Sequence, residues 1–522
     1  MSDAADRWAG TAERQLATVA RNVSTRYMSI AAEMIIGLIM VPFNLAHLGA
    51  AQYGLWILLG SVTIHLSLLE LGYGGAIVKF MAHYRARRDA RALNEIASTT
   101  FFVFAAMGLV AYGAAAGLAF NLEHIFRLTA EQAEIGKWIL LIIGVHVALN
   151  FPFSVYGGLC TGFQRIDVNN VVAVGVAIAA AVANVVVLLA GYGLVTLVAA
   201  TTAVRVCGYF IYRRNALRIY PDLRIHPSLF RKARLQEITG FSIYASIIDW
   251  ANKLNYELDE VVIGIFFGSA YVGVWAVAER LISGTQRLTN QLNGVLFPVI
   301  VDSDASHQRE KLQRILLQGT LLSLAMVVPI AAALILLADQ LVLAWVGPEM
   351  RGSVPVIRIL AFAVAIRVGN ATATTLLKGA GEHRMLAWTN LGTGVVNVVL
   401  SVALIKPYGL VGVAVGTLIP IACSSIFIVQ PAAYRRVCLP MRVAFRQSVW
   451  PAVWPAFVIA GVLALSGGVS SGTLLAVGLQ AVTAGLLYLV LVFGIAVSRK
   501  DRLYYFAKAM ELAGRRPLPT AA

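Results

Sequence analysis

The sequence predicts an all-α polytopic membrane protein with fourteen transmembrane helices, arranged as two pseudo-symmetric six-helix lobes plus two extra C-terminal helices. Three observations lead to this fold class. Apolar residues make up 59% of the 522 residues, and the mean hydropathy is +0.76. Apolar runs of about 20 residues, the length that a helix needs to cross a bilayer, recur along the chain. Short motifs from the first half of the sequence also return in the second half in the same order.

The expected spans are apolar stretches separated by short polar or glycine-rich connections. They cover about residues 25–46, 52–81, 95–119, 134–160, 168–190, 194–212, 238–266, 271–299, 314–337, 354–378, 385–405, 410–431, 447–466 and 472–497. Residues 1–24 are polar for too long a stretch to be a cleaved signal peptide, so we expect a cytoplasmic N-terminal segment there. None of the connections has room for a folded soluble domain.

An internal repeat relates the first six spans to the next six. Residues 49–56 (GAAQYGLW) and 268–275 (GSAYVGVW) lie at hairpin tips 219 residues apart, and residues 162–165 and 381–384 have the same separation. Each repeat holds an even number of spans, so both lobes enter the membrane the same way round. Parallel repeats of this kind place a central site between two lobes.

The repeat and the spans together divide the chain into segments. Between and beside the lobes lie connections that are rich in Lys and Arg. The segments are the cytoplasmic N-terminal segment 1–24, the N-lobe 25–218, a basic cytoplasmic loop 219–237, the C-lobe 238–431, helices 13 and 14 at 447–497, and a basic cytoplasmic tail 498–522.

The net charge of +16 is explained by membrane orientation. Over the expected connections, roughly thirty Lys and Arg fall on one side of the membrane and about four on the other, which is the asymmetry of the positive-inside rule. The basic side is therefore cytoplasmic, and both termini lie on it. A nucleic-acid partner is not expected.

Enzymatic activity is not supported by any pattern in the sequence. There is no Walker-type GxxxxGK[ST] motif for ATP hydrolysis, and no large external loop that would hold catalytic groups. The four cysteines show neither a disulfide framework nor a metal-binding spacing. We expect no catalytic residues, no metal site and no cofactor.

Charged residues gather in the apolar stretch 240–298. On a helix, Asp249, Lys253, Glu257 and Glu260 share one face, and Asp259 lies beside them. The following helix carries a polar stripe made of Arg280, Ser283, Arg287 and Gln291. A charge in mid-bilayer costs at least about 2.5–3.5 kcal/mol, so such residues usually face a bundle interior or a water-filled path. The pattern predicts a polar cavity that handles a charged molecule.

Several motifs resemble the polysaccharide-exporter branch of the MOP superfamily, whose Wzx-type members are lipid-linked oligosaccharide flippases. They are 48–56 (LGAAQYGLW), 71–88 (LGYGGAIVKFMAHYRARR), 162–168 (GFQRIDV), 258–281 (LDEVVIGIFFGSAYVGVWAVAERL) and 379–413. The resemblance covers about residues 20–435. It implies transfer of an undecaprenyl-diphosphate-linked oligosaccharide from the inner to the outer leaflet of the bacterial cytoplasmic (inner) membrane by alternating access, for surface polysaccharide (exopolysaccharide or O-antigen) assembly.

For such a substrate, arginine is the expected ligand of the diphosphate, because its planar fork binds phosphate oxygens bidentately and keeps its charge. The expected diphosphate-binding residues are Arg280, Arg287, Lys253 and Arg367. The alternative is a structural network, with Arg280 paired to Glu260 and Lys253 paired to Asp249 and Glu257. Candidates for coupling transport to H⁺, Na⁺ or the membrane potential are Glu33, Glu70, Asp249, Glu257, Asp259 and Glu260.

Other polar residues have two interpretations. His146, Asn150 and Ser154 would contact sugar hydroxyls or serve as polar contacts between helices. No charged residue lies between Arg446 and Arg499, so helices 13 and 14 are expected to face lipid and to flank a groove for the acyl tail. Besides membrane lipids and the lipid-linked glycan, the expected partners are a polysaccharide polymerase and glycosyltransferases.

Two other classes of function compete with the flippase. A multidrug or small-molecule ion-coupled antiporter of the same superfamily would share the fold, but cavity arginines repel a cationic drug. A scaffold for envelope synthesis would not need charges inside the membrane. The intramembrane arginines therefore favour the flippase.

Overall fold

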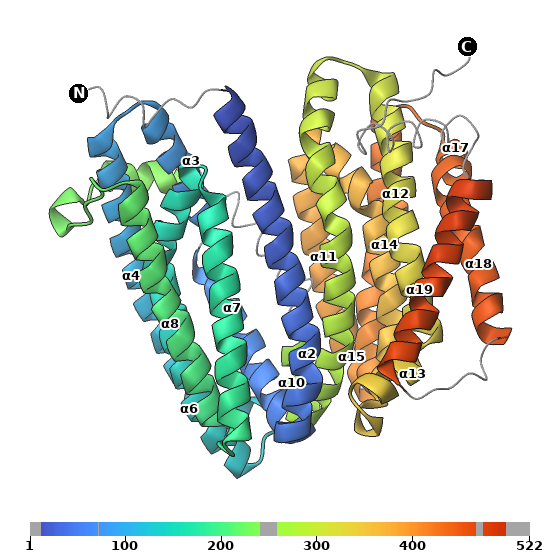
Figure 1. The fold of residues 1–522 in the computed structure, drawn as a ribbon, viewed down its shortest axis with the longest axis horizontal. Helices are drawn as coiled ribbons and strands as arrows, with labels where there is room; N and C mark the ends of the chain where they lie inside the picture. The colour runs from blue at the N-terminus through green and yellow to red at the C-terminus, as the bar shows by residue number, and fades with distance from the viewer. Residues whose placement is uncertain (1–11, 71–72, 241–257, 466–472, 497–522) are drawn as a thin grey trace. The chain divides into compact units, whose positions relative to one another are not determined.

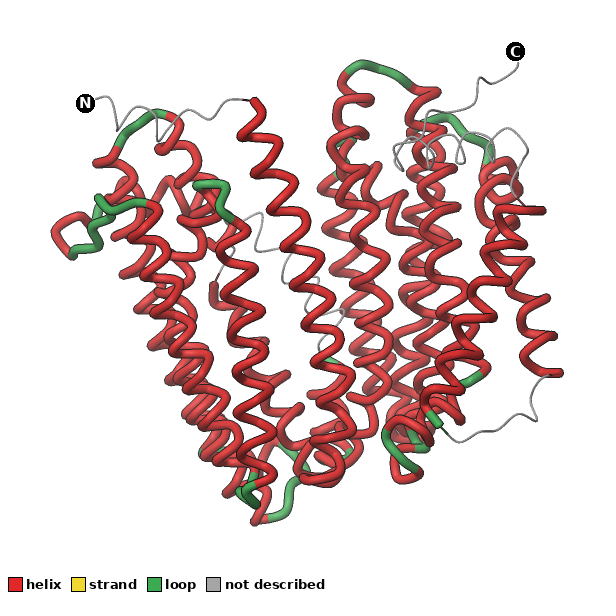
Figure 2. Tube along the Cα trace, viewed as in Figure 1, coloured by secondary structure: helices red, strands yellow, loops and turns green. Residues whose placement is uncertain are grey.

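The computed structural model of the chain describes residues 12–70, 73–240, 258–465 and 473–496 (Figure 1). Helices are the only regular elements in these ranges, as Figure 2 shows, and this confirms the all-α fold class. Nine helices of the described ranges have the length and composition needed to cross a membrane. The protein is a multi-pass membrane protein.

The chain forms two compact units, Met1–Ala276 and Val277–Ala522. Helix α11 begins in the first and continues in the second. The helices of the first unit are α2 (Ala12–Leu66), α3 (Tyr73–Ala86), α4 (Ala90–Ala119), α5 (Leu122–Ile125), α6 (Ala130–Gly162), α7 (Ile166–Leu189), α8 (Leu194–Ile219) and α10 (Asp259–Phe266). Those of the second are α11 (Ser269–Ala305), α12 (Arg309–Leu336), α13 (Ala338–Trp345), α14 (Ser353–Gly379), α15 (His383–Cys423), α16 (Gln430–Arg436), α17 (Met441–Ala444), α18 (Trp450–Leu465) and α19 (Leu474–Leu491).

Two of the longest helices are each interrupted by a single glycine. Gly49 divides α2 with φ 73° and ψ 168°, and Gly409 divides α15 with φ 62° and ψ −141°. Glycine adopts positive φ without the steric cost that a Cβ imposes. These glycines are the turns that the sequence predicts between spans 25–46 and 52–81 and between spans 385–405 and 410–431.

The expected spans overlap described helices, with one exception and two differences. Span 238–266 lies mostly outside the described residues, so the count of fourteen stays a prediction. Span 52–81 is not one helix, because α2 ends at Leu66, a 3₁₀ turn follows at Ser67–Glu70, and α3 starts at Tyr73. Gly74 and Gly75 stand at this restart, where glycine weakens a continuous helix.

The first span also begins earlier than the apolar pattern predicts. Helix α2 runs from Ala12, so part of the expected N-terminal segment 1–24 continues directly into the span. The Asn22 side chain accepts a hydrogen bond from the Asp167 backbone N–H at 2.9 Å and donates one to the Gln164 carbonyl at 2.9 Å. The start of α2 is thereby fixed to the turn between α6 and α7.

Within the first unit, the two repeat-related hairpin tips touch. A Cβ on Gly54 of α2 would overlap the Ser269 carbonyl oxygen, and one on Gly273 of α11 would lie 2.7 Å from the Ala50 carbonyl oxygen. Small residues let membrane helices approach to backbone contact. This packing explains why the start of α11 belongs to the first unit.

The core of the first unit lies between α3, α4 and α6. It is built by buried apolar side chains such as Ile77, Met81, Leu93, Phe104 and Leu159. Glycines bring the same helices together, since a Cβ on Gly158 would meet Ile77 at 2.7 Å and one on Gly162 would meet Met81 at 2.7 Å.

Segment 220–240, which contains most of the predicted basic loop, is docked on α3 and α4. Ser98 of α4 donates to the Arg224 carbonyl at 3.1 Å, and Thr99 accepts from the Arg231 backbone N–H at 3.0 Å. Tyr73 shares a hydrogen bond of 2.8 Å with Thr239. These hydrogen bonds hold segment 220–240 against α3 and α4 along most of its length.

Arg234 is the centre of this docking. Its guanidinium lies 3.2 Å from the buried Glu95 carboxylate and 3.1 Å from Glu237, and it donates to the Tyr84 hydroxyl at 2.7 Å. Burial and the hydrogen bond to Glu237 raise the pKa of Tyr84, so its hydroxyl stays protonated and donates. Arg91 and Arg231 also face Glu95, at 3.1 and 3.7 Å.

We predict that Glu95→Gln destabilises the first unit by about 2–3 kcal/mol, because a buried ionic hydrogen bond is lost and Arg234 keeps fewer partners. The measurement is the thermal unfolding midpoint of the purified protein, together with the rate of tryptic cleavage in segment 220–240. Arg91→Gln is the matched control, since its side chain is 80% exposed and an exposed pair contributes about 0–1 kcal/mol. Equal effects of the two substitutions would contradict the docking role of Glu95.

In the second unit, α12 and α14 pack closely through both polar and apolar side chains. A Cβ on Gly319 of α12 would lie 2.7 Å from the Thr372 side chain, and one on Gly369 of α14 would lie 2.7 Å from Leu324. Helices α18 and α19 lie beside α12 (Figure 1). The buried Tyr488 of α19 donates a hydrogen bond to the Ala452 carbonyl of α18 at 2.5 Å.

Candidate functional site

The described arginines of the predicted diphosphate site lie on α11 and α14 of the second unit. Arg280 is half-buried and Arg287 is exposed, two turns further along α11. Arg367 of α14 donates from Nη1 to Oε1 of Gln286 at 2.9 Å. Gln286 precedes Arg287, so the structure brings Arg367 beside the helix that carries the other two. Lys253 lies outside the described residues.

Buried hydrogen bonds fix how α11 faces α14. The Thr372 hydroxyl donates to Oδ1 of Asn293 at 3.1 Å and lies 3.4 Å from the hydroxyl of Ser323 on α12. All three side chains are buried. With these side chains held inside, the rotation of α11 is set, and Arg287 is left at the surface of the unit.

The acidic candidates are only partly described. Asp249 and Glu257 lie outside the described residues. Asp259 is buried in the first turn of α10, and Glu260 beside it is half-buried. Glu33 of α2 is half-buried and accepts a hydrogen bond of 3.5 Å from Ser29. The roles of these residues in coupling, and the alternative ion-pair network, stay predictions.

Glu70 is the last residue of the 3₁₀ turn before α3, and the position of its carboxylate requires a glycine nearby. A Cβ on Gly74 would overlap Oε1 of the Glu70 carboxylate, whereas one on Gly75 would meet nothing within 4 Å. The space above Gly74 is therefore occupied by the carboxylate. Glu70 also lines a cavity in the first unit.

We predict that Gly74→Ala reproduces the transport phenotype of Glu70→Gln at normal protein level. The added methyl group displaces a flexible carboxylate rather than the backbone, so folding is preserved while the acid is moved. Gly75→Ala is the matched control and should be neutral or stabilising by about 0.5–1 kcal/mol, as expected for Gly→Ala in a helix. The measurement is transport per folded molecule, and equal behaviour of the two alanine variants would show that Glu70 does not need this position.

The cavity of the first unit has a volume of about 370 Å³ and is bordered by three helices. Helix α2 and its 3₁₀ turn contribute Trp56 and Glu70, and α6 contributes the sequence-predicted His146, Asn150 and Ser154. The remaining lining residues are Gly60, Thr63, Ile64, Ser67, Ile143, Val147, Phe151, Val198, Thr201, Thr202 and Arg205. The structure thus brings Glu70 together with the three polar residues that the sequence had grouped on one span.

Arg205, Trp56 and Tyr209 belong to this region and were missed from the sequence. Arg205 stands inside the predicted span 194–212, eight residues before Arg213, which is about 12 Å along a helix. Its distance from the basic end of the span is the sequence signal that could have identified Arg205. Trp56 and Tyr209 carried no such signal, because aromatic residues in a membrane helix usually pack in the core.

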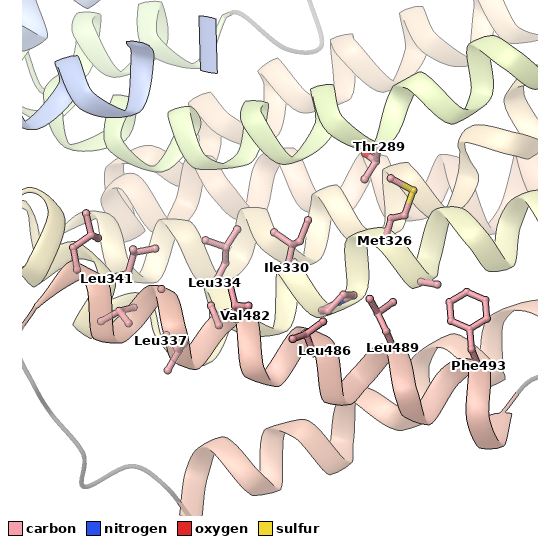
Figure 3. Close-up of a pocket in the computed structure, with 18 of the residues that line it drawn as sticks. Thr289, Met326, Ile330, Leu334, Leu337, Leu341, Val482, Leu486, Leu489 and Phe493 are labelled. Atoms are coloured by element: carbon pink, nitrogen blue, oxygen red, sulfur yellow. The ribbon is translucent and has the colours of Figure 1, made fainter. Parts of the chain in front are cut away.

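The second unit contains a long apolar groove between α12, α13 and α19, with a volume of about 750 Å³ (Figure 3). Leu334 and Ile330 face it from α12, and Val482 and Leu486 face it from α19. Thr289 of α11 is the hydroxyl-bearing residue among those that line it. Helix α11 thus borders the groove through Thr289 and also carries Arg280 and Arg287. Helix α19 corresponds to the expected helix 14 and borders this groove, whereas a role of the groove for an acyl tail stays a prediction.

Long apolar helices in two compact units define the fold of a multi-pass membrane protein. Solved structures support this fold. The lipid II flippase MurJ in an inward closed conformation matches with a TM-score of 0.71 at 12% identity, covering 90% of this chain and 98% of that one. An inward-facing multidrug resistance MATE transporter of the MOP superfamily gives a TM-score of 0.64 at 15% identity, covering 80% and 98%.

The chain belongs to the family of polysaccharide biosynthesis proteins, whose pattern matches residues 48–355. It is similar to the probable flippase AglR of Haloferax volcanii, at 22% identity over 80% of this chain and 83% of that protein. It also resembles the succinoglycan biosynthesis transport protein ExoT of Rhizobium meliloti, at 27% identity over 40% of this chain and 41% of that protein. These relatives are flippases and transport proteins, in line with the prediction of a transporter rather than an enzyme.

Proposed function

We propose that the protein moves an undecaprenyl-diphosphate-linked oligosaccharide from the inner to the outer leaflet of a bacterial cytoplasmic membrane by alternating access. The observation that carries the proposal is that one unit holds both arginines on the contacting helices α11 and α14 and an apolar groove between α12, α13 and α19. A lipid with an anionic head and a long apolar tail needs both surfaces. A small cationic drug needs neither.

The arginines and the groove act on different parts of this lipid. Arg280, Arg287 and Arg367 would bind the diphosphate, because guanidinium keeps its charge and binds phosphate oxygens in pairs. The tail gains little free energy on passing from lipid into an apolar groove, since both surroundings are equally apolar. The groove therefore guides the tail, and the affinity comes from the head.

Coupling to H⁺, Na⁺ or the membrane potential completes the proposal, since the sequence contains no nucleotide-binding motif. The candidate coupling residues in the described part of the chain are Glu33, Glu70, Asp259 and Glu260. A polymerase and glycosyltransferases of the same pathway would supply and use the substrate.

The experiment is a transbilayer assay in proteoliposomes loaded with undecaprenyl diphosphate that carries a single N-acetylglucosamine. An impermeant galactosyltransferase with labelled UDP-galactose outside modifies about half of the lipid without transport and all of it with transport. Rhodamine 6G uptake is measured in parallel. Movement of the dye without movement of the lipid would overturn the flippase and favour the antiporter.

The proposed orientation places the basic ends of α3 and α8, and both termini, in the cytoplasm. We predict that a cysteine at exposed Arg88 is protected from an impermeant thiol reagent in intact cells, whereas one at exposed Asn121, at the other end of α4, reacts. Permeabilised cells, in which both positions should react, are the control. Labelling of the Arg88 position in intact cells would reverse the orientation.

A further inference from the structure

The cavity of the first unit presents polar groups whose hydrogen-bonding roles are set by their neighbours. The Tyr209 hydroxyl donates to Oδ1 of Asn150 at 3.1 Å and lies 2.8 Å from Nδ1 of His146. The rings of Tyr209 and His146 are stacked, with centroids 5.6 Å apart and planes 8° apart. Tyr209 therefore holds the amide of Asn150 with its NH₂ group available as a double donor.

Hydroxyl groups of the cavity donate their protons within the protein and leave their oxygen atoms as acceptors for a ligand. Ser154 donates its proton to the Phe151 carbonyl at 2.7 Å, and Thr201 donates to the Leu197 carbonyl at 2.8 Å. Each keeps oxygen lone pairs for a ligand. The cavity thus offers donors from Asn150 and acceptors from Ser154 and Thr201, on two different helices.

The charges that line the cavity balance. Glu70 contributes one carboxylate, and Arg205 contributes one guanidinium. Arg205 makes no hydrogen bond or ion pair with another residue in the described ranges. No group of three or more His, Cys, Asp or Glu that could hold a metal ion occurs among the described residues. A neutral ligand rich in groups that both donate and accept fits this wall better than a cation.

The rest of the wall is apolar and includes the indole of Trp56 with Ile143 and Val198. A pyranose ring has this double character, with hydroxyls around its edge and C–H groups on its faces. The volume of about 370 Å³ lies within the range of about 300–1,000 Å³ that is usual for small-molecule sites.

We propose that this cavity binds one sugar residue of the glycan head, an inference that rests on the proposed flippase function. Asn150 and Arg205 donate to the sugar hydroxyls, Ser154 and Thr201 accept from them, and Trp56 packs against a C–H face. Such a site favours the glycosylated lipid over a bare lipid diphosphate, because the bare lipid has no sugar hydroxyls to make these hydrogen bonds. The residues proposed to recognise the sugar all belong to the first unit.

The test compares equilibrium binding of four probes to purified protein: undecaprenyl diphosphate and its derivatives with glucose, galactose or N-acetylglucosamine. Wild-type protein should bind at least one glycosylated probe about tenfold or more tightly than the bare diphosphate. Asn150→Ala should reduce this ratio about three- to tenfold and Arg205→Gln about tenfold, the effects of one neutral and one ionic hydrogen bond.

The controls separate the sugar site from the proposed function. Arg214→Gln, on the exposed end of α8, should keep the wild-type ratio, and Arg287→Ala should weaken all probes alike. Size-exclusion profiles confirm that each variant is folded. If no probe binds, the proposed function fails and the sugar site with it. If the probes bind but the cavity variants leave the ratio unchanged, or no sugar improves binding, the sugar site alone is overturned.

Discussion

Arg280→Ala or Arg287→Ala is expected to stop glycan export and to make the lipid-linked precursor accumulate, with the protein still inserted at a near-normal level. Each arginine makes a charge-assisted contact to phosphate in the proposed complex. Such a contact is worth about 1.5–3 kcal/mol, which is tenfold or more in affinity. The half-buried Arg280 should show the larger loss, because its surroundings screen the phosphate less than those of the exposed Arg287.

Conservative variants sharpen this prediction. Arg→Lys should restore part of the activity, since it keeps the charge but loses the bidentate fork, and Arg→Gln should not. Arg314→Ala is the matched control, an exposed arginine on α12 of the same unit. The measurement is export per folded transporter in cells, with the amount of precursor in the inner leaflet as a second readout.

The structural alternative predicts a different pattern. If Arg280 serves an ion pair, Arg280→Ala should lower the amount of protein, and neutralising Glu260 in the same molecule should restore it. Normal export per molecule in the Arg280→Ala/Arg287→Ala double variant would rule out the diphosphate role.

Much of the fold could be predicted because membrane helices follow simple physical rules. Apolar runs and the positions of Gly49 and Gly409 indicate the spans and their turns, since each helix must satisfy its own backbone in lipid. The break before α3 could not be placed, because Gly74 is also compatible with a continuous membrane helix. The structure shows why position 74 is a glycine, since the Glu70 carboxylate occupies the space where a Cβ would lie.

The candidate sites were predicted less completely, because a site depends on contacts between distant residues. His146 and Asn150 stood out together on one span and Glu70 on another, but no sequence pattern indicated that they line one cavity with Arg205. Arg367 was expected among the diphosphate-binding residues, yet its contact with Gln286 on another helix comes only from packing. Only the Lys and Arg of the connections were assigned a role in orientation, and Arg205, in the middle of α8, was not considered.

The second large effect is expected at the contact between the tips of α2 and α11. Gly54→Ala places a methyl group where the Ser269 carbonyl oxygen lies, so the two tips must separate. Overpacking of this kind costs about 1–3 kcal/mol. If the tips form the outer gate of an alternating-access transporter, that cost acts on the closed state and shifts the equilibrium toward opening by about five- to 150-fold.

Cross-linking measures this shift directly. Cysteines that replace Ala50 and Ser269 should cross-link when the tips are closed and thereby block transport, and Gly54→Ala in the same protein should slow the cross-linking strongly. Gly294→Ala, on the same helix α11 with nothing within 4 Å of the added Cβ, should leave both cross-linking and transport at the level of the parent protein. Because every atom of the contact belongs to two backbones, no side-chain rearrangement can relieve the overlap at Gly54, and the tips themselves must move. Cross-linking and export at unchanged rates in the Gly54→Ala protein would show that transport does not require the tips to meet.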